Sequence, residues 1–269
     1  VGSPLAAAPR VAKISFTGSN AVGVQVMQRA AETVKGVSLE LGGKSSLLVL
    51  EDADLDLALE LACGGGFFNA GQMCSATSRV LVADSLADEF LQRLTARVEG
   101  IRVADPFAED VEMGALINHA QYQRVLAHIQ RGVQDGARLL CGGERPAHLA
   151  KGYFIRPTLF TDVPLDSALW QQEIFGPVLC VRRFTTEDEA IALANDSDFG
   201  LVASVVSRNG EAAERVANAL QAGMVWINAP QLIFAQTAWG GYKQSSIGRE
   251  LGPWGLAAFQ EIKHVIRSN

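Results

Sequence analysis

Short apolar runs alternate with amphipathic stretches along most of the chain. The run at residues 46–50 is continuously apolar, as in strands buried within a parallel sheet. The stretch 119–133 places Tyr122, Val125, Leu126 and Ile129 on one helical face. Strands that alternate with helices predict an α/β fold, a mostly parallel sheet with flanking helices.

The same pattern places the remaining elements. Further strands are predicted at 11–17, 36–41, 79–83, 137–141, 158–163, 178–184, 202–206 and 224–228, and a final one at 259–267. Helices are predicted at 21–33, 55–68, 86–98, 211–220 and, after the capping box that begins at Thr186, up to Asn195. Acidic residues between 52 and 56 favour the start of a helix over a calcium loop, because the calcium spacing is incomplete.

Cys74 is the first candidate for chemistry. It follows a Gly-Gln turn after the apolar run 55–68, a position that can open onto a cleft. A thiolate is a strong nucleophile, and its pKa can be lowered near helix ends. The alternative is a small buried hydrophobe, which is the commoner role of an isolated cysteine.

Glu40 is the second candidate. It lies between two leucines in an apolar run that ends at Gly42 and Gly43. Burying a carboxylate raises its pKa unless it has a partner, and a raised pKa suits a general base near neutral pH. The alternative is an ordinary strand glutamate that faces water.

A glycine turn joins the first strand to the first helix at residues 18–23 (GSNAVG). Free N–H groups at a helix start can bind an anion or a nucleotide phosphate. The spacing differs from the usual dinucleotide fingerprint, so an ordinary strand-to-helix turn explains it equally well.

Several motifs in order resemble the aldehyde dehydrogenase superfamily: 39–44 (LELGGK), 67–74 (FFNAGQMC), 173–177 (EIFGP) and 238–243 (AWGGYK). The last segment resembles betaine-aldehyde dehydrogenases, although Ser246 replaces a common glycine. The resemblance implies the catalytic domain of that fold plus the end of its Rossmann-like domain. It divides the chain into 1–41 (cofactor domain), 42–228 (catalytic domain) and 229–269 (return segment and oligomerisation tail).

The resemblance also implies roles. Cys74 would attack the aldehyde, and Glu40 would activate water to hydrolyse the resulting thioester. NAD or NADP would contact Gly18, Ser19, Gly23, Leu41, Glu173 and Phe175. The substrate pocket would include Met73, Ser75, Phe234 and Trp239, whose aromatic rings could hold a trimethylammonium group; Trp226 is expected in the core. Asn20 replaces the usual threonine of the glycine turn.

The composition of the chain limits which kinds of binding partner are expected. The net charge is −6 with no basic cluster, so no nucleic acid is expected. No signal peptide is seen and no run reaches the ~20 apolar residues that span a bilayer, so no membrane is expected. The four cysteines show no metal or disulfide spacing. We expect a small-molecule aldehyde substrate, no metal, a dimer or tetramer of identical subunits, and a reducing cytoplasm.

The resemblance begins partway through the family's cofactor domain, and roughly the first half of a typical member has no counterpart. That half carries an asparagine of the oxyanion site and a lysine that contacts the adenosine ribose. The chain is therefore expected to be a fragment, half of a two-chain enzyme, or inactive alone. Two other functions stay open: a cofactor-independent cysteine esterase or acyl transferase, and a non-catalytic assembly subunit. The lack of a histidine near Cys74 or Glu40 in the sequence disfavours a Cys-His pair.

Overall fold

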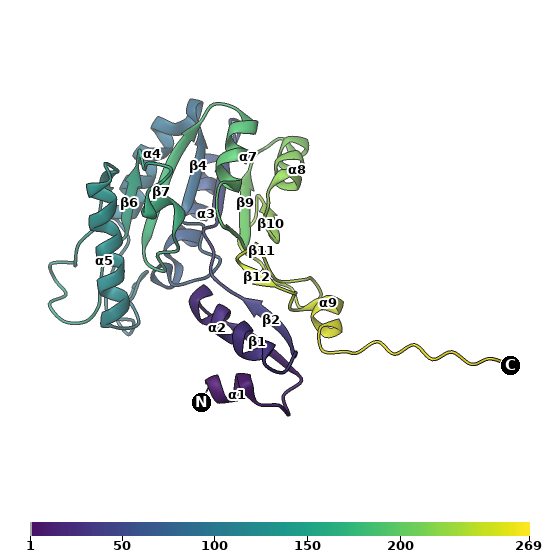
Figure 1. Cartoon of the computed structure of the whole chain (residues 1–269). Coiled ribbons are helices and arrows are strands. Elements are labelled where there is room, and N and C mark those ends of the chain that lie inside the picture. The colour runs from purple at the N-terminus through teal and green to yellow at the C-terminus, as the bar shows by residue number, and fades with distance from the viewer. Residues whose placement is uncertain (1) are drawn as a thin grey trace.

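The large sheet is the centre of the molecule (Figure 1). The computed structural model describes residues 2–269. Seven strands lie in the order β10-β9-β3-β4-β7-β6-β5, and all neighbours are parallel except β5, which is antiparallel to β6. Their bounds are β3 Ser46–Val49, β4 Arg79–Ala83, β5 Arg138–Cys141, β6 Thr158–Thr161, β7 Val178–Phe184, β9 Val202–Val206 and β10 Met224–Ile227. The predicted α/β fold with a mostly parallel sheet is confirmed.

Helices cover both faces of this sheet, as right-handed crossovers between parallel strands require. Helices α3 (Leu55–Phe67) and α4 (Asp84–Glu99) pack together on one face, and α7 (Glu187–Asn195) and α8 (Gly210–Ala219) on the other (Figure 1). Helices α5 (His119–Gln134) and α6 (Ala168–Gln171) pack on each other near the β5 edge. The central strands are buried on both faces, which explains why they read as continuous apolar runs.

A second, small sheet lies below the large one. It consists of β1 (Lys13–Thr17), β2 (Gly36–Glu40) and β12 (Ser246–Ile247), with β1 and β2 parallel and β12 antiparallel to β2. Helices α1 (Gly2–Ala7) and α2 (Asn20–Ala31) pack beside it. Two further short strands, β8 (Phe199–Gly200) and β11 (Tyr242–Lys243), pair with each other close to the junction between the sheets.

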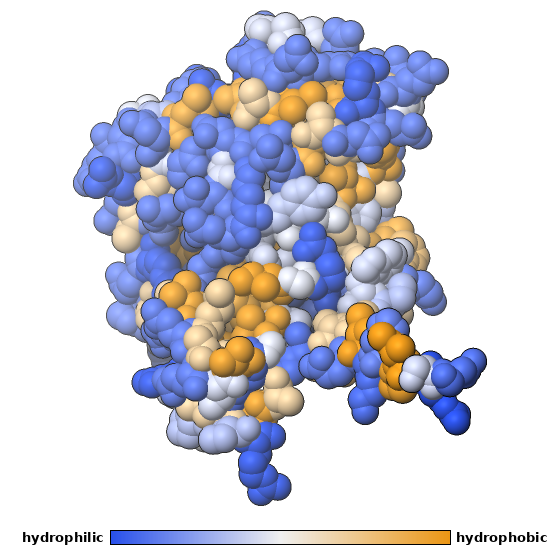
Figure 2. All heavy atoms as spheres, turned by 45° about the vertical axis from the view of Figure 1, so that its right-hand side comes forward, coloured by the Kyte–Doolittle hydropathy of each residue, from blue (hydrophilic) through white to orange (hydrophobic). Residues whose placement is uncertain are grey.

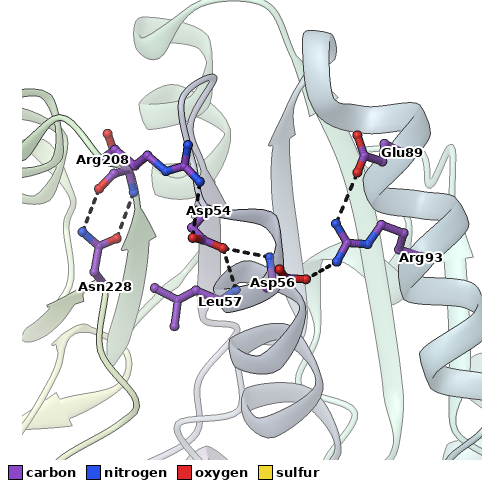
Figure 3. A network of polar contacts seen from close by, with 8 residues as sticks. Asp54, Asp56, Leu57, Glu89, Arg93, Arg208 and Asn228 are labelled. Carbon is purple, nitrogen blue, oxygen red and sulfur yellow. Dashed lines mark hydrogen bonds and ion pairs between the residues drawn. The ribbon is translucent and has the colours of Figure 1, made fainter.

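A network of polar contacts fixes the start of α3, the helix that leads to Cys74 (Figure 3). The Asp54 carboxylate accepts from the backbone N–H of Asp56 and Leu57 at 3.0 and 3.2 Å, which caps the helix as its acidic start predicted. Arg208 at the end of β9 contacts Asp54 at 3.3 Å, and Arg93 of α4 pairs with Asp56. The start of α3 is therefore tied both to the segment after β9 and to the neighbouring helix α4.

The C-terminal segment corrects one prediction. No strand forms at 259–267: the backbone hydrogen bonds there are local ones, from Phe259 to Leu256 and from Gln260 to Ala257, and no described strand pairs with the segment. Helix α9 (Gly252–Ala257) is followed by an extended segment whose Ile262 side chain is 99% exposed. Figure 2 shows apolar side chains at the surface of this segment and of the lower unit formed by α1, α2 and β1.

The ends of the other predicted helices and strands differ from the structure by at most two residues. The pattern did not predict the short elements α1, α6, β8, β11, β12 and α9, which are too brief to show a period. Trp226 lies in the core, as expected, and Cys141 is buried there too. Within residues 2–269, no helix combines the length and apolar character needed to cross a membrane.

Arg79 joins the large sheet to the junction with the small one. It begins β4, is 2% exposed, and lies over the Trp170 ring at 5.3 Å. It donates to four backbone carbonyls, those of Lys44, Leu193, Ala194 and Asp196, at 2.8 to 3.4 Å. Burial lowers the pKa of Arg79 to about 10, so the group stays charged at neutral pH.

Arg79→Met should destabilise the protein by about 3 kcal/mol or more, because two buried and two partly buried hydrogen bonds to carbonyls lose their charged donor. Urea unfolding followed by circular dichroism measures the change. Arg138→Met is the matched control, since Arg138 makes an exposed ion pair with Asp162, and it should cost below about 1 kcal/mol. Equal losses in the two variants would contradict this account.

Candidate active site

The candidate site lies between the two sheets, where Figure 1 shows the chain passing from one to the other. Glu40 is the last residue of β2, at the carboxyl end of the small sheet. Cys74 precedes β4, and Glu173 precedes β7, at the amino ends of the parallel strands of the large sheet. The link 41–45 connects these two ends, so it brings residues far apart in sequence into one place.

Glu40 is buried, at 4% exposure, and does not face water. Its Oε2 atom has no hydrogen-bond partner among the described residues. Burial raises its pKa to about 8; Glu250 adds to this rise, while Arg249 and Ser246 partly offset it. A carboxyl group with this pKa can exchange a proton close to neutral pH.

The segment before Cys74 has an unusual backbone. After α3, Asn69, Ala70 and Gly71 have φ values of 50°, 55° and 69°, all in the left-handed region. This conformation costs free energy for residues other than glycine, so the surroundings must hold it. The Asn69 and Gln72 side chains each donate to the other's carbonyl at 3.1 Å, and Gln72 accepts from the Ile117 N–H at 2.9 Å.

Cys74 itself is half-buried. Its pKa is raised, mainly by burial, then by the negative charge of Glu173, with a smaller effect from Glu40. The backbone N–H groups of Ser75 and Cys74 act in the opposite direction, because they stabilise the thiolate. The same N–H groups could stabilise negative charge on an oxygen bound next to the sulfur.

Gly42 and Gly43 allow the three segments to meet. A Cβ atom on Gly42 would lie 2.4 Å from Glu173 Oε2, and one on Gly43 would lie 2.7 Å from the Cys74 carbonyl oxygen. The Gly43 N–H donates to Glu173 Oε1 at 3.2 Å. Burial raises the pKa of Glu173, and the Gly43 N–H, Lys44 and Arg124 partly offset this.

The Glu173 segment contacts the cysteine loop directly. A Cβ on Gly71 would lie 2.1 Å from the Gly176 carbonyl oxygen, so the two backbones touch. Phe175 has a φ of 55°, and its carbonyl accepts from Gln121 Nε2 at 2.7 Å. Glu173 and Phe175 are therefore held rigidly beside the cysteine loop.

The residues predicted for the substrate pocket divide into two sets. Ser75 is buried, and Met73 is half-buried on the same loop as Cys74. Trp239 and Cys74 both pack against a small apolar cluster formed by Leu201, Val202 and Trp226. Phe234 lies on the same connecting segment as Trp239 but is 54% exposed, so it faces outward in this chain.

The predicted cofactor residues near the first helix also lie at the junction. Gly18 and Ser19 are exposed at the start of α2, where Ser19 makes no side-chain cap. The Gly18 N–H donates to the Glu40 carbonyl at 3.0 Å. Gly23 gives room for Leu41, because a Cβ there would lie 2.6 Å from Leu41 Cδ2. These residues thus place the turn next to the base candidate.

A hollow of about 770 Å³ lies beside this turn, between α1, α2 and β1. Its walls include the apolar side chains of Leu5, Ile14, Phe16, Val22 and Val26. This volume falls in the range that holds drug-sized ligands. This hollow could not be expected from the sequence, because α1 was not predicted.

Sequence reasoning missed several residues that assemble the site. The Asn20 side chain accepts from the Gly42 N–H at 3.1 Å and donates to the Gln244 carbonyl at 2.7 Å, so this departure from the usual threonine has a structural role. The Ser245 hydroxyl donates to the Gly42 carbonyl at 2.7 Å. A Cβ on Gly240 would lie 2.8 Å from Glu40 Oε1. These residues could not be identified from the sequence, because a hydrogen bond between a side chain and a distant backbone group leaves no periodic pattern.

Comparisons with known proteins place the chain in a family. The aldehyde dehydrogenase family matches residues 1–265. The peroxisomal aminoaldehyde dehydrogenase 2 of Pisum sativum is 50% identical over 98% of this chain and 52% of its own length. The chloroplastic betaine aldehyde dehydrogenase of Amaranthus hypochondriacus is 49% identical over 99% of this chain and 53% of its own length.

A solved structure agrees with these relatives. The betaine aldehyde dehydrogenase of Staphylococcus aureus, crystallised in complex with NAD+, superposes with a TM-score of 0.94 at 44% identity. The match covers 96% of this chain and 52% of that one. The chain thus spans about half the length of the curated relatives it matches. With its family motifs gathered at one junction between two sheets, the chain belongs to the aldehyde dehydrogenase family.

Proposed function

We propose that this chain carries the thiol and the base of an NAD(P)-dependent aldehyde dehydrogenase, which oxidises an aldehyde to a carboxylic acid. The observation that carries the proposal is the meeting of Glu40, Cys74 and Glu173 around Gly42 and Gly43. A buried carboxyl with a pKa of about 8 beside a half-buried thiol is unusual outside functional sites. The division into segments 1–41, 42–228 and 229–269 is part of this proposal.

The residues present fit a dinucleotide. The Gly18 N–H is used by the Glu40 carbonyl, but the exposed turn places the first N–H groups of the twelve-residue helix α2 where a phosphate can approach them. The apolar hollow between α1, α2 and β1 suits an aromatic base, and Glu173 can accept hydrogen bonds from ribose hydroxyls. Phe175 lies next to Glu173, and Gly23 and Leu41 support the turn. When bound, the nicotinamide would accept a hydride, which no side chain can do.

The protein residues would act in two stages. The Cys74 thiolate adds to the aldehyde carbon, and the Cys74 backbone N–H stabilises the resulting alkoxide. After the former aldehyde carbon has been oxidised, it remains bound to Cys74 as the acyl group of a thioester. Glu40 then takes a proton from water, the water oxygen attacks the thioester carbon, and the acid leaves as the thiolate re-forms.

We infer that the substrate is an aldehyde with an ammonium group, such as betaine aldehyde. The relatives named above as betaine and aminoaldehyde dehydrogenases support this class. Trp239 and Phe234, with Met73 and Ser75, would line the path to Cys74, and aromatic rings attract cations. Exposed apolar side chains on the C-terminal segment favour assembly into an oligomer of identical chains.

The compartment is proposed from the cysteines. Cys63, Cys74, Cys141 and Cys180 are all free in the described part of the chain, which suits the reducing cytoplasm. The plant relatives carry peroxisomal and chloroplastic names, and these compartments are the alternatives that cell fractionation would test.

The first test measures reduced-cofactor formation by absorbance with the chain, NAD+ and betaine aldehyde. Cys74→Ala should abolish turnover, whereas Cys63→Ala, the matched control, should keep it within about twofold. A second readout is independent of the cofactor. Iodoacetamide should label Cys74 before Cys63, Cys141 and Cys180, because burial raises the pKa of each of those three thiols to about 11. Equal labelling of all four would contradict the assignment.

The pH dependence of that labelling tests the charge arrangement. Glu173 and Glu40 both raise the pKa of Cys74, and Glu173 has the larger effect. Replacing an anion by a neutral amide must therefore lower the pKa, so labelling should begin at lower pH in Glu173→Gln and, to a smaller extent, in Glu40→Gln. Rate-against-pH profiles measure the midpoints. A shift upward in either variant would contradict the geometry.

Glu40 as a base is tested with an activated ester. Acetyl transfer from p-nitrophenyl acetate to Cys74 should give a burst in both the parent and Glu40→Gln, while release of acetate should slow about a hundredfold or more in the variant. In the parent, acetate release should rise with pH up to about 8 and then level, because only the ionised carboxylate accepts a proton. Loss of the burst, with release unaffected, would assign Glu40 a different role.

A further inference from the structure

Gln231 makes two reciprocal hydrogen bonds with the residue that follows Cys74. The Ser75 hydroxyl donates to Gln231 Oε1 at 2.8 Å, and Gln231 Nε2 donates to the Ser75 carbonyl at 2.9 Å. Ser75 is 4% exposed and Gln231 is half-buried, so both bonds are partly shielded from water. Shielded hydrogen bonds that satisfy each other's polar groups hold their segments more firmly than exposed ones.

The two residues belong to different parts of the chain. Ser75 is on the cysteine loop, whereas Gln231 is on the connecting segment 229–239, which carries Phe234 and Trp239. The distance along the sequence is 156 residues. The pair is therefore a direct link between the thiol and the side chains proposed to meet the far end of the substrate.

The connecting segment is anchored at both ends as well. Before it, Asn228 and the Ser207 backbone exchange two hydrogen bonds at 2.7 and 3.0 Å (Asn228 is labelled in Figure 3). At its end, Trp239 and Glu250 exchange two backbone hydrogen bonds of 2.8 Å. Between these anchors the Trp226 ring N–H donates to the Leu232 carbonyl at 2.9 Å. Gln231 adds the contact that fixes the segment to the cysteine loop itself.

The chemistry of the pair requires an amide. Glutamine presents a donor and an acceptor at once, which match the Ser75 carbonyl and hydroxyl. Glutamate can accept from the hydroxyl but would place a second acceptor against the carbonyl. Methionine has nearly the same shape and makes neither bond. These substitutions separate the hydrogen bonds from the volume of the side chain.

We propose that Gln231 is a specificity-determining positioning residue: through Ser75 it holds segment 229–239 at a fixed distance from Cys74. This inference rests on the proposed function, and it concerns the same site. Loss of the link lets Phe234 and Trp239 move relative to the sulfur. A reactant with a cationic head group should then lose its advantage, while a small neutral reactant should be unaffected.

Two thiol reagents provide a test that needs no cofactor and no turnover. Methyl methanethiosulfonate and trimethylammonioethyl methanethiosulfonate both react with the Cys74 thiolate, which forms a mixed disulfide and displaces methanesulfinate. They differ in the head group, so the ratio of their rates reports the head-group site. Mass spectrometry of the peptide that contains Cys74 measures each rate, with the peptide of Cys63 as an internal reference.

Gln231→Met should lower the cationic-to-neutral rate ratio by about fivefold or more, in line with the strength of cation–π contacts. Its rate with the neutral reagent should stay within about twofold of the parent. Gln236→Met is the matched control, because Gln236 is an exposed glutamine on the same segment, and it should leave the ratio unchanged. Every variant keeps Glu40 and Glu173. The attraction of these charges for the cationic reagent therefore cancels when the rate ratios of two variants are compared.

Two further variants separate linking from folding. Ser75→Ala removes one of the two bonds and should give an intermediate ratio, and adding Gln231→Met to it should lower the ratio no further than Gln231→Met alone. If Gln231→Met folds poorly by circular dichroism, Gln231→Leu, which also makes neither bond and adds no charge, should give the same lowered ratio. A purely structural role would slow or speed both reagents together.

The outcomes distinguish the two levels of inference. An equal ratio in Gln231→Met and Gln236→Met, with Cys74 still the fastest thiol, overturns the role of Gln231 and leaves the proposed function standing. Reaction of Cys74 no faster than Cys63 with either reagent in the parent chain overturns the proposed function itself. A lowered ratio in Gln231→Met alone supports the link.

Discussion

The backbone at Gly42 and Gly43 must pass between the Glu173 carboxylate and the Cys74 carbonyl with no space for a side chain. A single Cβ at either position would come within 2.7 Å of one of these groups or closer, which real contacts do not permit. Two sheets, the cysteine loop and the segment before β7 therefore all depend on this one passage. Asn20 and Ser245 hold its N–H and carbonyl groups, and Arg79 holds the carbonyl of the next residue, Lys44.

Around this passage the protein retains groups that a core would normally exclude. Glu40 keeps one buried oxygen without a partner, and the buried Lys44 Nζ also has none among the described residues. Burial lowers the pKa of Lys44 to about 8, while it raises the pKa of Glu40 to about 8. Such groups reduce the free energy of unfolding, so their presence points to chemistry rather than to packing.

Much of the fold could be predicted from the pattern of apolar and polar residues. Strands β3, β4, β7 and β9 are buried on both faces, so each appears in the sequence as a mainly apolar run. The predicted strand at 259–267 was wrong, because a strand exists only where another backbone pairs with it. Cys74 and Glu40 could be proposed from motifs. Gln231, Ser245 and Gly240 could not, because their contacts depend on segments that only the folded chain brings together.

The position of the candidate site has a mechanical consequence. Glu40 ends a strand of the small sheet and Cys74 precedes a strand of the large one, so their separation is a property of the interface between two sheets and not of either sheet. The links across that interface include residues 41–45, the segment between β10 and β12, and the hydrogen bonds of Ser245. A slight rotation of one sheet against the other would separate the Glu40 carboxylate from the Cys74 thiol, while both sheets kept their hydrogen bonds. Mild denaturant or pressure should therefore abolish the reactivity of the site well before the secondary structure is lost.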